Sequence, residues 1–85
     1  MNIIEKNLAN VIYKQTYMTV TTLLLRQIYV YREPDKSFRV EFEGGLHEYY
    51  ADPKNVLTAL GEEEDIIRVE VTFPSLNERI LIYGD

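Results

Sequence analysis

Two stretches of the chain alternate between apolar and polar side chains, apart from the Ile66–Ile67 pair that opens the second. Residues 38–43 alternate three large apolar residues with one arginine and two glutamates, and residues 66–73 carry an apolar residue at every odd position. Successive side chains of a strand point to opposite faces of a sheet. Each stretch therefore predicts a β-strand with one buried side and one side that faces solvent.

Each alternating stretch has a neighbour with which it can form a hairpin. Residues 27–32 also alternate, and a proline-containing turn sequence connects them to residues 38–43. Proline presets the backbone for such a turn. Residues 79–83 follow residues 66–73 after a second loop that also begins with proline. The sequence thus predicts two β-hairpins.

The sequence also predicts two helices. Asp52 followed by Pro53 is a typical helix start, because the acid caps free backbone amides and proline fits the first helical position. Gly61 is expected to end this helix, which we predict over residues 53–60. Apolar residues at helical spacing predict an N-terminal helix over residues 3–14.

Two further segments are ambiguous. Residues 16–25 favour a strand through their β-branched and aromatic content, but no turn residue follows them, so a helix ending near Gln27 is the alternative. Residues 46–50 are a candidate for a short additional strand. We expect one α+β domain over residues 1–85, with an antiparallel sheet of four or five strands and helices on one face. The residues expected inside are Phe38, Val40, Phe42, Val56, Leu57, Leu60, Ile67, Val69, Val71 and Ile82.

Length and composition exclude several classes of protein. A chain of 85 residues is too short for two separate cores. It has no cysteine, which excludes disulfides and cysteine-based metal sites. Its longest apolar run, Leu23–Leu25, is far shorter than the roughly 20 residues of a membrane helix, and its start does not resemble a signal peptide. We expect a cytoplasmic protein without a membrane segment, a metal or a cofactor.

Charge is distributed unevenly along the chain. Residues 1–32 hold four basic residues and one acid, whereas residues 33–70 hold eleven acids and four basic residues. Such a surface repels itself, and a basic partner protein is the simplest reason to retain it. The alternative is that the acids only keep the loops soluble. The acids expected to contact a partner are Glu41, Glu43 and Glu70 on the outer sheet face, together with Glu62, Glu63, Glu64 and Asp65.

Tyrosine is abundant, with seven residues in the chain. Tyr29 and Tyr31 share one strand face, and rigid amphipathic tyrosines are enriched at protein interfaces. We expect these two residues to contact a partner. An alternative is a homo-oligomeric ligand-binding or regulatory domain, with a pocket between subunits that is lined by Tyr29, Tyr31, Tyr49 and Tyr50. A third interpretation is that tyrosine is simply a good strand residue.

Catalysis and nucleic-acid binding have little support. His47 is the single histidine, and an enzyme would have to use it with Glu48 or Asp52. No metal-ligand spacing surrounds it, and we expect an ordinary surface histidine. The acidic segment would be repelled by nucleic-acid phosphates.

These observations predict a small acidic protein-interaction module that is not an enzyme. Such a protein would act as an inhibitor, antagonist or adaptor by occupying a surface of its partner. Its size and charge are similar to those of small acidic inhibitors carried by bacteriophages and mobile elements. If the partner binds nucleic acid, the acidic surface would compete for its basic groove.

Overall fold

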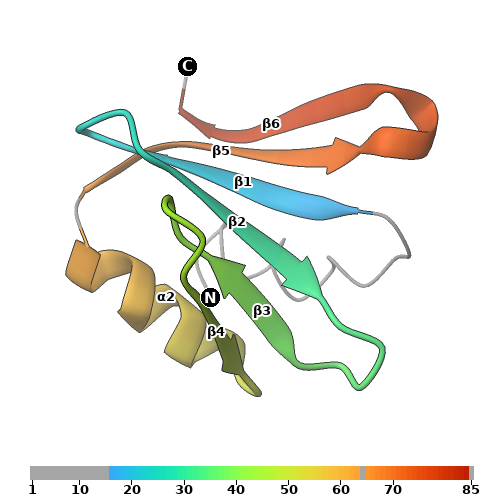
Figure 1. Ribbon diagram of the computed structural model, residues 1–85. Helices are drawn as coiled ribbons and strands as arrows, with labels where there is room; N and C mark the ends of the chain where they lie inside the picture. The colour runs from blue at the N-terminus through green and yellow to red at the C-terminus, as the bar shows by residue number, and fades with distance from the viewer. Residues whose placement is uncertain (1–15, 64, 85) are drawn as a thin grey trace.

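The computed structural model describes residues 16–63 and 65–84. Six strands form one antiparallel sheet in the order β4-β3-β2-β1-β5-β6, and a single helix, α2 (Pro53–Glu63), connects β4 to β5 (Figure 1). The strands are β1 (Tyr17–Thr22), β2 (Gln27–Arg32), β3 (Phe38–Glu41), β4 (His47–Tyr50), β5 (Ile66–Phe73) and β6 (Glu78–Gly84). The connection through α2 carries the chain from one edge of the sheet past β3, β2 and β1.

The predicted fold class is confirmed, but the strand count is wrong. The sheet has six strands because both ambiguous segments pair: β1 lies between β2 and β5, and β4 extends the sheet beyond β3. The two predicted hairpins are present as β2–β3 and β5–β6. The predicted N-terminal helix over residues 3–14 lies outside the described residues.

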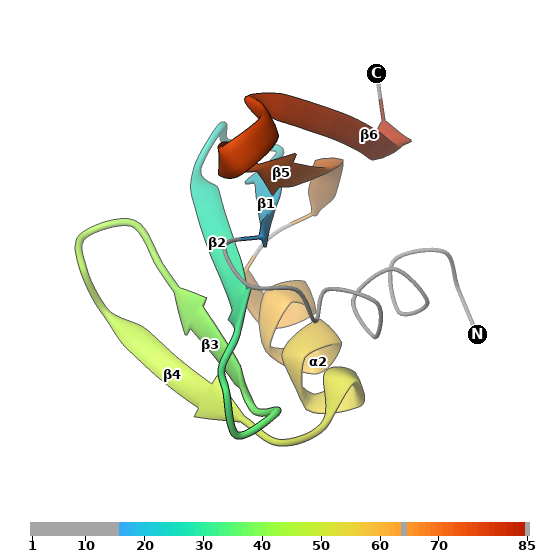
Figure 2. The same cartoon turned by 90° about the vertical axis from the view of Figure 1, so that its right-hand side faces the viewer.

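One face of the sheet packs against α2 and encloses the core (Figure 2). Strand alternation sends every second side chain of β1, β2, β3 and β5 to this face, where the helix contributes Val56 and Leu60. The buried apolar residues are Met18, Val20, Ile28, Val30, Phe38, Val40, Val56, Leu60, Val69 and Val71. None of the described helices is long and apolar enough to cross a membrane.

Helix α2 begins where the sequence predicts and ends later. The Asp52 carboxylate accepts a hydrogen bond from the Lys54 amide at 2.8 Å, which confirms the predicted cap. The prediction that Gly61 ends the helix is wrong, because α2 continues to Glu63. A glycine that ends a helix normally adopts a positive φ. Gly61 is not among the positive-φ glycines of the described chain and is an ordinary helical residue.

The predicted core is largely confirmed. Six of its residues are buried, Phe42 and Ile82 pack partly buried against them, and Leu57 is half-buried. Ile67 was wrongly placed inside, since 37% of it is exposed. The cause is a β-bulge: Thr21 pairs with Arg68 and Thr22 with Ile66, so Ile67 has no partner on β1. A bulge adds one residue to a strand and reverses the alternation beyond it, which brings Ile66 to the core.

Candidate protein-interaction surfaces

The face of the sheet opposite α2, here called the outer face, is not covered by any described element. Strand pairing places one side chain per strand side by side across it. Tyr17 lies opposite Tyr31, Tyr31 opposite Arg39, and Arg39 opposite Tyr49. The next row contains Thr19, Tyr29, Glu41 and His47, with Glu70 on the far side of Thr19.

Three tyrosines form a cluster at the centre of the outer face. The Tyr17 ring lies 5.7 Å from the Tyr29 ring in an edge-to-face arrangement and 5.2 Å from the Tyr31 ring. The Tyr29 hydroxyl donates a hydrogen bond to Gln27 Oε1 at 2.8 Å. The guanidinium of Arg39 lies 4.5 Å from the centre of the Tyr31 ring. These contacts hold the rings in place, so little side-chain entropy remains to be lost on binding.

The predicted acidic character of the outer face is balanced by arginine. Glu70 Oε1 lies 2.8 Å from Arg68 Nε, and this hydrogen bond holds the Glu70 pKa below its usual value. Arg39 Nε lies 3.4 Å from Glu41 Oε1 and 3.3 Å from Glu33 Oε1. Arg39 Nε is buried, and neither of its two contacts has hydrogen-bond geometry. Glu41 and Glu70 thus share this face as predicted, each beside an arginine.

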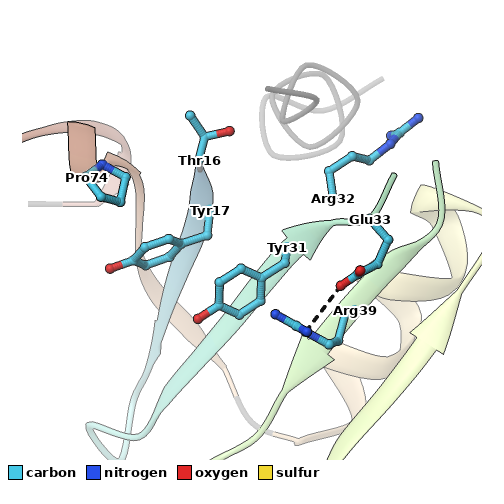
Figure 3. A pocket seen from close by; sticks show the side chains of 7 residues that line it. All are labelled: Thr16, Tyr17, Tyr31, Arg32, Glu33, Arg39 and Pro74. Carbon is cyan, nitrogen blue, oxygen red and sulfur yellow. Dashed lines mark ion pairs between the residues drawn. The ribbon is translucent and has the colours of Figure 1, made fainter. Parts of the chain in front are cut away.

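A hollow of about 400 Å³ adjoins the tyrosine cluster. In Figure 3 the Tyr17 and Tyr31 rings lie side by side and their hydroxyls point the same way. Burial, and after it the Glu41 charge, raises the pKa of Tyr31. The lining residues are Thr16, Tyr17, Tyr31, Arg32, Glu33, Arg39 and Pro74.

The four tyrosines of the alternative pocket do not share one face within a single chain. Tyr29, Tyr31 and Tyr49 share the outer face, whereas Tyr50 packs against the core. The central tyrosine, Tyr17, was missed because residues 16–25 were ambiguous. The sequence did contain a signal for a strand here, because Tyr17 and Thr19 alternate with the apolar residues Met18 and Val20.

Of the remaining predicted acids, the described ones belong to segments other than the strands of the outer face. Glu43 is exposed in the turn between β3 and β4. Glu62 and Glu63 are the last residues of α2, and Asp65 is exposed just before β5. Glu64 lies outside the described residues.

Glu48 and Asp52, the acids that an enzyme would have to use with His47, are occupied elsewhere or face away from it. His47 is exposed on edge strand β4, with its ring 5.6 Å from that of Tyr49. Glu48 is the next residue of the strand and points to the other face. Asp52 caps α2. Among residues 16–63 and 65–84, no group of acids and histidine is arranged to hold a metal ion.

The turn between β1 and β2 is a feature that the sequence reasoning missed. It consists of Leu23, Leu24 and Leu25, here called the leucine turn, and it contains none of the usual turn residues. The Thr22 amide donates to the Arg26 carbonyl at 3.0 Å, and the Leu25 amide donates to the Thr22 carbonyl at 2.8 Å. All three leucine side chains are more than half exposed.

In comparisons with known proteins, no family model, no curated protein and no solved structure matches the chain.

Proposed function

We propose that the protein is a small acidic interaction module of the cytoplasm, which acts as an inhibitor, antagonist or adaptor by binding a partner protein through the outer face. The observation that carries this proposal is the cluster of Tyr17, Tyr29 and Tyr31 on a sheet face that no described element covers. Tyrosine and arginine are enriched in the energetically dominant centres of protein interfaces. Here both occur together, since Arg39 stacks on Tyr31.

The charge pattern supports a division of roles. The outer face carries Arg39, Arg68 and Arg79 beside Glu41 and Glu70, so its centre is close to neutral. The other acids of the described chain include those of the turns, such as Glu43, and Asp65 just before β5. Peripheral charges mainly steer association, whereas buried aromatic residues determine dissociation. We expect the acids to attract a basic partner and the tyrosines to hold it.

The test is capture of partners from the native cell by immobilised full-length protein, followed by kinetics on the purified partner. Wild type is compared with Tyr31→Ala and with a matched control, Tyr83→Ala, which removes an exposed tyrosine on β6. The proposal predicts that Tyr31→Ala raises the dissociation rate by about 10–30-fold, as expected for an interface hot spot. Tyr83→Ala should dissociate like wild type. Equal dissociation of all three proteins would contradict the proposal.

A second candidate function is binding of a small ligand by a homo-oligomer. The hollow beside Tyr17 and Tyr31 favours it, because its volume of about 400 Å³ falls within the usual range for ligand sites. Native mass spectrometry of the purified protein distinguishes the two. An oligomer that retains a small molecule would favour this candidate over the interaction module.

A further inference from the structure

Strand β6 is an edge of the sheet, and no described strand pairs with its outward side (Figure 1). Alternate amides and carbonyls of an edge strand point away from the sheet, where they can pair with another extended segment. Proteins normally protect such edges by short strands or charged side chains. The opposite edge strand, β4, is protected in this way, because it has four residues and includes Glu48. Strand β6 has seven residues and no charge from Ile80 to Gly84.

The apolar side chains of β6 are exposed on both faces of the sheet. Ile80 pairs with the buried Val71 and so lies on the face of the core, yet 49% of it is exposed. Leu81 pairs with Glu70 on the outer face, and 43% of it is exposed. Where one face of an antiparallel sheet meets solvent, its residues are usually polar. Both side chains would be covered if the sheet continued beyond β6.

The local charge favours a second copy of this chain as the added strand. The chain has a net charge of −5, so two copies repel each other over most approaches. Residues 66–84, which contain the β5–β6 hairpin, hold two arginines and two glutamates and are neutral. Residues 38–50 at the other edge hold three glutamates and one arginine. Two copies therefore meet with least repulsion at β6.

The sequence of β6 permits one symmetric register. Facing residues of an antiparallel pair lie on the same face of the sheet, so a symmetric pair is centred on one residue. Centring on Glu78 or Arg79 would place like charges opposite each other, which is destabilising. Centring on Leu81 would continue the pairing past the β-bulge at Ile82, beyond which the side chains change faces. Centring on Ile80 avoids both, and Arg79 then faces Leu81 of the second copy.

We propose that β6 is a homodimerisation edge, at which β6 of a second copy pairs antiparallel, centred on Ile80, about a two-fold axis perpendicular to the sheet. The paired segment is residues 78–82, which leaves Tyr83 outside it. The axis keeps each face of the sheet on its own side, so both tyrosine clusters lie on the same side of one continuous sheet. The contact is a single strand pair, so the dimer dissociates on dilution. The proposal requires no partner protein.

Disulfide trapping of the full chain tests the register. The chain has no cysteine, so Ile80→Cys introduces a single thiol. In the proposed dimer the two Cα atoms of residue 80 lie about 4.5–5.5 Å apart, a distance that a disulfide spans. With copper phenanthroline as oxidant, we expect Ile80→Cys to form a covalent dimer faster than the control Leu76→Cys. Leu76 is 64% exposed in the turn between β5 and β6, so equal or slower trapping of Ile80→Cys would overturn the proposal.

Sedimentation velocity of the purified chain over a concentration series measures the dimer and its variants. Leu81→Lys places a lysine opposite Arg79 of the second copy, whereas Leu81→Glu places a glutamate there. We expect dimerisation of Leu81→Lys to be about tenfold weaker than that of Leu81→Glu. Within one chain the preference is reversed, because position 81 faces Glu70. An effect that acted only through stability of the monomer would therefore have the opposite sign.

The control for a general effect of added charge is Tyr49→Lys, which changes an exposed residue of the other edge and should leave the dimer unchanged. A wild-type chain that stays monomeric up to about 1 mM would overturn the proposal. Dimerisation of Leu81→Lys that equalled that of Leu81→Glu, or a dimer lost in folded Tyr49→Lys, would overturn it as well. These experiments use the purified chain alone, so their outcome is separate from that of the partner-binding test of the outer face.

Discussion

Replacing Leu25 by asparagine should stabilise the protein. Leu25 has φ +65°. This left-handed conformation costs an L-residue about 1–2 kcal/mol, and asparagine tolerates it because its side chain can hydrogen-bond locally. Since 74% of Leu25 is exposed, the burial that is lost amounts to only about 0.5 kcal/mol. The expected net gain in the free energy of unfolding is about 0.5–1 kcal/mol. In a domain of this size that corresponds to a rise in Tm of roughly 2–8 °C.

Urea denaturation of wild type and variants, with the slope m compared between them, is the appropriate assay. Leu24→Asn is the matched control, because Leu24 lies in the same turn with similar exposure but without a positive φ. It should be no more stable than wild type. Lys36→Asn replaces the equivalent residue of the β2–β3 turn, at φ +71°, and should also stabilise. If Leu25→Asn gained nothing relative to Leu24→Asn, the argument from backbone strain would be refuted.

Three further predictions concern the core, the outer face and the histidine. Leu60→Ala should lower the free energy of unfolding by about 2–5 kcal/mol, because Leu60 is fully buried. Leu57→Ala should lower it by clearly less, because Leu57 is half-buried. Equal losses for the two variants would contradict the packing of α2. Because Arg68 lowers the pKa of Glu70, that carboxylate contributes stability above its unfolded-state pKa of about 4.3 and loses it as the pH falls through the lowered pKa. The stability difference between wild type and Glu70→Gln should therefore shrink in acid titrations, and a constant difference would contradict the pairing. His47→Ala should leave folding by circular dichroism unchanged and should weaken partner binding far less than Tyr31→Ala, because His47 lies on edge strand β4. A turnover abolished by this variant with folding preserved would refute the interaction-module interpretation.

Most of the sheet could be predicted because apolar and polar residues alternate within the sequence of its strands. The alternation of residues 38–43 and 66–73, and the cap formed by Asp52, depend on neighbouring residues in the sequence. The bulge that exposes Ile67 depends on how β5 pairs with β1, and no local pattern shows it. The leucine turn was missed for a related reason: hydrogen bonds from Thr22 and Leu25 close it, although its residues are poor turn formers.

The sequence predicted which residues share the outer face, but not how their side chains contact one another. Alternation correctly placed Tyr29, Tyr31, Glu41 and Glu70 on one face. The arginines beside both glutamates required knowledge of side-chain geometry, because an arginine two residues away on a strand can point to its neighbour or to solvent. The predicted acidic sheet face is therefore a tyrosine-centred face with paired charges.

The measurement that tests the central claim most directly is the dissociation rate of the captured partner from wild type, Tyr31→Ala and Tyr83→Ala. All three proteins are first shown by circular dichroism to be folded. Binding through the outer face predicts that dissociation from Tyr31→Ala is about 10–30-fold faster than from wild type, while Tyr83→Ala is unchanged. Dissociation at the wild-type rate from a folded Tyr31→Ala protein would contradict the claim that the outer face holds the partner.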